Sequence, residues 1–141
     1  MINYYDWAEH QSKMHSNKVA ITDYSLNKKI SYKELNLSSC KIANFLQNMG
    51  IGHSDRVAIL SKNHSIFFEL QFACSKIGSI MVPLNWRLTA NELAFILNDC
   101  EPCLLIVDDC FKTTADQLCS FIPNMNIKFF NSDENQNEFQ E

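Results

Sequence analysis

The chain has 141 residues, a formal net charge of −4 at pH 7, and charged side chains at 20% of its positions. This length suits one domain and is enough to bury roughly two thirds of the surface that the unfolded chain exposes. The lysines and arginines form no cluster in the sequence. This charge pattern argues against a sequence-independent hold on nucleic acid.

The sequence shows no recognisable secretion signal or membrane-spanning stretch. The N-terminal residues lack the basic and apolar segments of a secretion signal, and the longest apolar stretch, residues 65–84, is interrupted by polar side chains. We therefore expect a soluble, cytoplasmic protein with no transmembrane segment. In that compartment the six cysteines are expected to be reduced thiols. Small-hydrophobe packing on predicted apolar helix faces is expected for Cys40, Cys74, Cys100 and Cys119.

The first third of the chain is predicted to form a helix, a hairpin and a second helix. Residues 1–17 are predicted to form an amphipathic helix that leads into the fold. Two β-prone runs, Val19–Thr22 and Ile30–Tyr32, are typical of a hairpin with a longer loop. Ser31 and Glu34, three residues apart, predict a capping box at the start of the next helix.

A buried strand and an apolar helix are predicted next. Gly50 closes the preceding helix. Arg56–Leu60 is nearly continuously apolar after its arginine, as expected for a parallel strand that is covered on both faces. Residues 67–77 predict a helix that is apolar around much of its circumference, and we expect it to be sandwiched between layers.

The stretch from residue 76 to residue 93 ends one helix, forms a short strand and begins another helix. Gly78 suits a left-handed helix cap, and Ser79–Val82 has the length of a strand. Because Pro83 cannot donate a hydrogen bond to a sheet ladder, the strand is predicted to end there. Thr89 and Glu92 predict a second capping box.

The last third continues the alternation of strands and helices. A strand is predicted at Leu104–Val107, a helix at Phe111–Phe121 and a strand at Ile127–Phe130. The pattern predicts an α/β fold with a layered, mostly parallel sheet flanked by helices, formed by residues 1–130. Residues 131–141 are polar and acidic, so we expect them to form a disordered tail.

Four blocks of sequence, in a fixed order and at fixed distances, carry a resemblance to a known family. They are Ile30–Asn36; Gly50–Ile51 with Asp55–Leu60; Phe68–Leu70 with Phe72–Ala73 and Lys76–Gly78; and Val82–Leu93 with Ile96–Asp99. Together these blocks resemble the N-terminal part of the AMP-forming acyl-CoA synthetases, which belong to the adenylate-forming superfamily. Ordered blocks at matching distances are much more specific than one short motif.

This resemblance implies that the chain is part of an enzyme that joins a carboxylic acid to CoA through an acyl adenylate. Among carboxylic acids, the resemblance favours fatty acids as the substrate class. The parent enzyme would use ATP, Mg²⁺ and CoA. In the family the phosphate loop and the catalytic lysine lie downstream of the matched blocks, and the three glycines of this chain are explained as turn and helix punctuation. The resemblance therefore implies an N-terminal fragment that has no catalytic residues, binds no ATP by itself and works with the missing remainder of the ligase.

One residue of the resemblance is a candidate ligand contact. Arg87 matches an arginine that lies near a CoA phosphate in some CoA ligases, and a guanidinium suits phosphate through bidentate hydrogen bonds. The alternative is that Arg87 braces the turn that follows Pro83. Asn85 and Trp86 are interpreted as turn and packing residues. At Ser54 the family commonly has glycine, so the serine either strains a left-handed turn position or is accommodated by a local rearrangement of the turn.

Cys100 and Cys103 fit a C-x-x-C pattern, with Cys110 and Cys119 further along. The spacing is irregular for zinc, and a predicted core strand intervenes, so no metal site is expected. A redox pair would place Cys100 at a helix N-terminus, whereas the pattern places it at a helix end. We interpret these cysteines as structural.

An alternative to the ligase is a non-catalytic function in protein association. The helix over residues 67–77 is apolar on many sides, and an uncovered apolar face promotes association. The alternative is therefore a stand-alone, non-catalytic module that binds another protein or itself.

Overall fold

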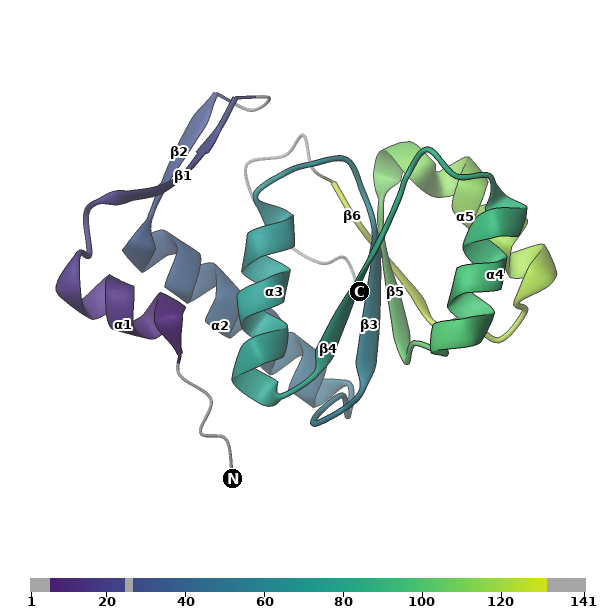
Figure 1. Ribbon diagram of the computed structural model, residues 1–141, viewed down its shortest axis with the longest axis horizontal. Coiled ribbons are helices and arrows are strands. Elements are labelled where there is room, and N and C mark those ends of the chain that lie inside the picture. The colour runs from purple at the N-terminus through teal and green to yellow at the C-terminus, as the bar shows by residue number, and fades with distance from the viewer. Residues whose placement is uncertain (1–5, 25–26, 132–141) are drawn as a thin grey trace. The chain divides into compact units, whose positions relative to one another are not determined.

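The computed structural model describes residues 6–24 and 27–131 of the chain (Figure 1). Two compact units make up the chain, the first with residues 1–54 and 64–79 and the second with residues 55–63 and 80–141. The first residues of the predicted leading helix and nearly all of the predicted tail, residues 132–141, lie outside the described residues. The disordered tail and the domain boundary at residue 130 stay predictions.

The first unit contains three helices and a hairpin. The helices are α1 (Trp7–Met14), α2 (Tyr32–Asn48) and α3 (Ile66–Ile77), and both α1 and α3 contact α2. Strands β1 (Val19–Asp23) and β2 (Lys28–Ser31) pair in antiparallel fashion, as the hairpin prediction requires, with an irregular register between Val19 and Ile21.

The predicted helix signals act as expected in this unit. The Ser31 hydroxyl accepts a hydrogen bond from the backbone N–H of Glu34, and the Glu34 carboxylate accepts one from the backbone N–H of Ser31. After α2, Gly50 adopts φ +80°, a left-handed conformation that glycine favours. The capping box and the glycine stop are therefore both confirmed.

Helix α3 differs from its prediction in how it is buried. Glu69 is only 2% exposed, whereas its neighbour Phe68 is 49% exposed. The expectation that this helix is sandwiched between layers is therefore not met at Phe68, which lies at the surface. The polarity of two adjacent side chains does not decide which of them faces the interior, because successive residues on a helix point about 100° apart.

The turn around Ser54 and Gly78 is left-handed on both sides. Ser54 has φ +68° and donates a backbone hydrogen bond of 2.8 Å to the carbonyl of Gly78, which has φ +73°. The serine therefore occupies the left-handed turn position itself. Glycine adopts this region freely, whereas a residue with a Cβ atom is strained there.

The second unit is an α/β sheet with two helices. Its strands are β3 (Arg56–Leu60), β4 (Ile80–Leu84), β5 (Leu104–Asp108) and β6 (Ile127–Phe130), in the order β4-β3-β5-β6. All three neighbouring pairs are parallel. This confirms the α/β class and the parallel sheet that the apolar runs predict.

Helices α4 (Ala90–Cys100) and α5 (Lys112–Phe121) lie on one side of this sheet (Figure 1), and a short 3-10 turn at Asp109–Phe111 precedes α5. The core between them is apolar and fully packed. Its buried members are Ala58, Leu60, Leu84, Ala90, Leu93, Ala94, Leu97, Leu105, Val107, Ala115 and Leu118. Ala58 and Leu60 of β3 are among them, as the prediction of a strand covered on both faces requires.

The predicted end of β4 at Pro83 is wrong. The strand continues through Pro83 to Leu84, and Pro83 lies opposite Ile59 of β3. Proline is tolerated here because β4 is an edge strand of the described sheet, so its missing N–H leaves no neighbouring strand without a partner.

Across residues 6–24 and 27–131, no helix combines the length and the apolar character that crossing a bilayer requires.

Candidate functional site at the carboxyl edge of the sheet

The carboxyl ends of β3, β4 and β5 place three short segments at one edge of the second unit. In open parallel sheets, ligands bind outside the carboxyl ends of the strands. Ser61 and Lys62 follow β3, residues 85–87 follow β4, and Asp108 ends β5. This edge is therefore the part of the unit where a ligand is expected.

The segment after β4 is a tight turn that leads into α4. The backbone N–H of Leu88 donates to the carbonyl of Asn85 at 3.1 Å, and the backbone N–H of Arg87 donates to the Asn85 side-chain oxygen at 3.1 Å. Thr89 then begins α4 through the predicted capping box with Glu92. The interpretation of Asn85 as a turn residue is confirmed, and the turn fixes the backbone on both sides of Trp86.

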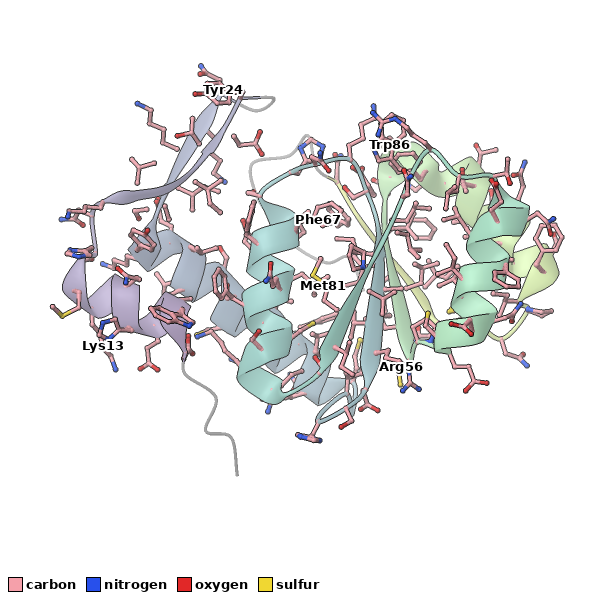
Figure 2. All side chains as sticks on the ribbon, in the orientation of Figure 1. Lys13, Tyr24, Arg56, Phe67, Met81 and Trp86 are labelled. Carbon is pink, nitrogen blue, oxygen red and sulfur yellow. The ribbon has the colours of Figure 1, made fainter. Side chains whose placement is uncertain are left out.

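Trp86 is the centre of the edge, and its position is labelled in Figure 2. The guanidinium carbon of Arg87 lies 4.2 Å from the centre of the Trp86 ring, and Nζ of Lys62 lies 5.9 Å from it. On the core side, Trp86 packs against Phe111, with ring centres 6.2 Å apart and a tilt of 41°. We call Lys62, Trp86, Arg87 and Phe111 the Trp86 cluster.

The two cations of the Trp86 cluster carry uncompensated charge. Lys62 and Arg87 are both exposed, and within the described part of the chain neither side chain pairs with a carboxylate. Lys112 of the same unit differs, because its Nζ lies 3.0 Å from a carboxylate oxygen of Asp109. The edge thus presents two positive charges against one aromatic ring, an arrangement suited to an anion beside a planar group.

A buried pair supports the edge from below. The Ser61 hydroxyl lies 3.3 Å from Oδ2 of Asp108, and the backbone N–H of Cys110 donates to Oδ1 of Asp108 at 3.3 Å. Both Ser61 and Asp108 are buried. The bond from Ser61 joins the ends of β3 and β5, next to Lys62. The bond from Cys110 fixes the turn between Asp108 and Phe111.

The predicted candidate, Arg87, lies at this edge. Its contact with Trp86 agrees with the bracing interpretation. Bracing does not exhaust the side chain, because a guanidinium has five N–H donors in its plane and a ring contact leaves donors for other acceptors. Sequence reasoning missed Lys62 and Phe111, although both lie within a few residues of the end of a predicted strand, which is the signal that places a residue at a carboxyl edge.

Cys100 and Cys103, the C-x-x-C pair, lie at the end of α4 and in the bend that follows it. Cys100 is the last residue of α4, where burial raises the pKa of its thiol. Cys103 is exposed, with its sulfur 3.6 Å from a carboxylate oxygen of Asp55. All six cysteines fall in the described part of the chain and are free thiols. A raised thiol pKa disfavours the thiolate that redox chemistry needs, which supports the structural interpretation of Cys100.

With the fold and the edge described, comparison with known proteins identifies the class. The chain belongs to the AMP-binding enzyme family, whose sequence pattern matches residues 8–136. It is 38% identical over 89 residues to a fatty acid–[acyl-carrier-protein] ligase, ScoC, of Streptomyces coeruleorubidus, a match that covers 63% of this chain and 17% of that protein. It is 28% identical over 127 residues to an indoleacetate–CoA ligase of Aromatoleum aromaticum, covering 90% of this chain and 24% of that ligase.

Solved structures agree with the observed fold. The N-terminal domain of FACL13 from Mycobacterium tuberculosis superposes with a TM-score of 0.83 at 26% identity, covering 94% of this chain and 34% of that one. The anthranilate CoA ligase AuaEII also gives a TM-score of 0.83, at 22% identity, covering 92% of this chain and 26% of its own. The fold is therefore that of the N-terminal portion of these ligases.

Proposed function

We propose that this chain supplies the N-terminal α/β portion of an ATP-dependent, AMP-forming ligase that joins a carboxylic acid to CoA. The observation that carries the proposal is the family match over residues 8–136, together with relatives named as acyl ligases. A fatty acid is the favoured substrate class, since the first of these relatives is named as a fatty acid ligase. The match favours this function over the stand-alone interaction module.

The proposed reaction needs more than these 141 residues. A carboxylate attacks the α-phosphate of ATP and releases pyrophosphate, after which the CoA thiol displaces AMP from the acyl adenylate. Such chemistry requires a cradle for the phosphates and a cation near the developing charge. The sequence has three glycines and no glycine-rich run. We infer that ATP and Mg²⁺ are held by other segments of the ligase, which are the principal partner of this chain, in the cytoplasm.

Arg87 is the residue of this chain that we assign to CoA. It is exposed at the carboxyl edge, has a fixed backbone and carries a charge that no carboxylate of the described residues neutralises. These properties suit a contact with one phosphate of CoA through charge-assisted hydrogen bonds.

Two assays of the purified chain test this function. Incubation with ATP, Mg²⁺, CoA and a panel of fatty and aromatic acids is expected to release no AMP, and release of AMP would overturn the inference that other segments are needed. Calorimetric titration is expected to show CoA binding that Arg87→Ala weakens about tenfold or more, because a charged hydrogen bond is lost. Arg87→Lys is the matched control, which keeps the charge without the fork of donors. Unchanged binding by Arg87→Ala would remove Arg87 from the site, and light scattering that shows self-association without CoA binding would favour the module.

A further inference from the structure

We propose that Lys62 is a second phosphate-binding residue at the carboxyl edge and that Trp86 is the residue that positions both Lys62 and Arg87. This inference rests on the proposed function, because it extends the CoA site beyond Arg87. The ligand class is a nucleotide phosphate group, which the two cations would bind together beside the Trp86 ring.

The two cations of the Trp86 cluster converge on one ring from neighbouring strands. Lys62 follows β3 and Arg87 follows β4, and these neighbouring parallel strands end in register, with Leu60 opposite Leu84. Lys62 lies two residues past Leu60, and Arg87 lies three residues past Leu84. The two cations approach one ring, at 5.9 Å and 4.2 Å from its centre. The pairing of the strands therefore brings together two charges that lie 25 positions apart in the sequence.

Placing two cations near one ring has an electrostatic cost, because like charges repel. Lys62 and Arg87 carry like charges near the same ring, and neither has a carboxylate partner among the residues described. The face of the Trp86 ring partly offsets this repulsion, since its negative quadrupole attracts cations. A phosphate group would offset it further by accepting hydrogen bonds from both side chains.

The Trp86 ring is held in a fixed position at the carboxyl edge. The Trp86 ring is half-buried and packs against Phe111, and the turn at Asn85 fixes the backbone around it. Long, exposed cationic side chains otherwise sample many rotamers, and ordering such a side chain on binding costs conformational entropy. A fixed ring that already holds both cations reduces this cost, which is the sense in which Trp86 positions them.

Calorimetric titration of the full chain tests the proposal, with CoA, inorganic pyrophosphate and pantetheine as probes. Pantetheine lacks the nucleotide phosphates, so it separates phosphate recognition from contact with the thiol arm. We expect CoA and pyrophosphate to bind and pantetheine to bind much more weakly. Lys62→Gln is expected to weaken CoA and pyrophosphate binding about fivefold at low salt and to flatten the salt dependence, because one screened charge pair is lost.

The variants of Trp86 separate positioning from folding. Trp86→Leu is expected to weaken CoA binding about three- to fivefold, the loss of an exposed cation–π contact, whereas Trp86→Phe retains binding to within about twofold. Lys112→Gln is the matched control, because Lys112 is paired with Asp109 and lies over Phe129 instead of Trp86. In a Trp7→Phe background, Trp86 fluorescence should change on titration with pyrophosphate, and thermal unfolding verifies that each variant is folded.

The outcomes separate this inference from the function on which it rests. Failure of the unaltered chain to bind either CoA or pyrophosphate would contradict both. CoA binding that Arg87→Ala weakens but that Lys62→Gln and Trp86→Leu leave unchanged would overturn this inference alone. Equal weakening by Trp86→Leu and Trp86→Phe would exclude positioning by the aromatic ring.

Discussion

Lys76 and Asp6 form an ion pair in the first unit, with Nζ of Lys76 2.5 Å from Oδ2 of Asp6. The same Nζ lies 2.8 Å from the side-chain oxygen of Asn36. The three residues belong to the last turn of α3, the N-cap of α1 and the body of α2. One partly buried ammonium group therefore connects all three helices of the unit.

We predict that breaking this connection destabilises the first unit. Lys76→Met removes the ammonium group and leaves its two acceptors, on Asp6 and Asn36, without that donor. The substitution should lower the free energy of unfolding by about 1–3 kcal/mol. Asp6→Asn and Asp6→Ala form a matched pair, because asparagine retains the N-cap bond to the backbone N–H of Glu9 and alanine does not. Urea denaturation should rank Asp6→Ala as the less stable variant, and equal stability of the two would show that the cap contributes nothing.

The two capping boxes should make stability depend on pH. Hydrogen bonds from the backbone N–H and hydroxyl of Ser31 lower the pKa of Glu34, and those of Thr89 lower the pKa of Glu92. Because the folded-state pKa lies below the unfolded value, which is about 4.3 for glutamate, the contribution is present above that value and is lost as pH falls through the folded-state pKa.

The measurement is the urea midpoint from pH 7 to pH 3. We expect the double substitution Glu34→Gln and Glu92→Gln to flatten the fall in stability on the acid side of about pH 4.5, since glutamine caps without titrating. An acid-side fall identical to that of the unaltered chain would show that the capping carboxylates do not contribute to it.

The left-handed turn predicts different effects on stability for substitutions at Gly78 and at Ser54. A Cβ atom on Gly78 would lie 3.0 Å from a ring carbon of His53, and the residue has φ +73°. Gly78→Ala should therefore lower the free energy of unfolding by at least about 1–2 kcal/mol. Ser54→Gly should be close to neutral, because relief of strain offsets the greater entropy of the unfolded chain. Thermal unfolding checks both, and a tolerated alanine at position 78 would contradict the strain argument.

Exposure and not residue type should decide the effect of substitutions on α4. Leu93 is fully buried in the core of the second unit, whereas Phe95, two residues later, is 77% exposed. Leu93→Ala should cost about 2–5 kcal/mol of unfolding free energy through cavity formation. Phe95→Ala should change it by less than about 0.5 kcal/mol, as surface substitutions usually do. A larger effect at Phe95 would place that side chain in a contact that the fold does not show.

Local signals predicted the secondary structure well, and non-local facts limited the rest. The capping boxes at Ser31 and Thr89 and the apolar run of β3 could be recognised because each depends on residues a few positions apart. The continuation of β4 through Pro83 could not, since it depends on the position of that strand at the sheet edge.

The candidate site was predictable only in part for the same reason. Arg87 was found through the family resemblance. Its neighbours Lys62 and Phe111 come from segments that meet only because β3 pairs with both β4 and β5, and no pattern in the sequence states that order. In α3, which of Phe68 and Glu69 is buried likewise depends on the direction that the helix turns to its neighbours.

Titration calorimetry of the purified chain with CoA, and separately with ATP and Mg²⁺, is the most direct test of the central claim. That claim is that this chain holds a phosphate contact for CoA at the carboxyl edge but no machinery for ATP. We expect heat on addition of CoA, CoA binding weakened about tenfold or more by Arg87→Ala, and no heat with ATP and Mg²⁺. Binding of ATP and Mg²⁺ with no binding of CoA would contradict it.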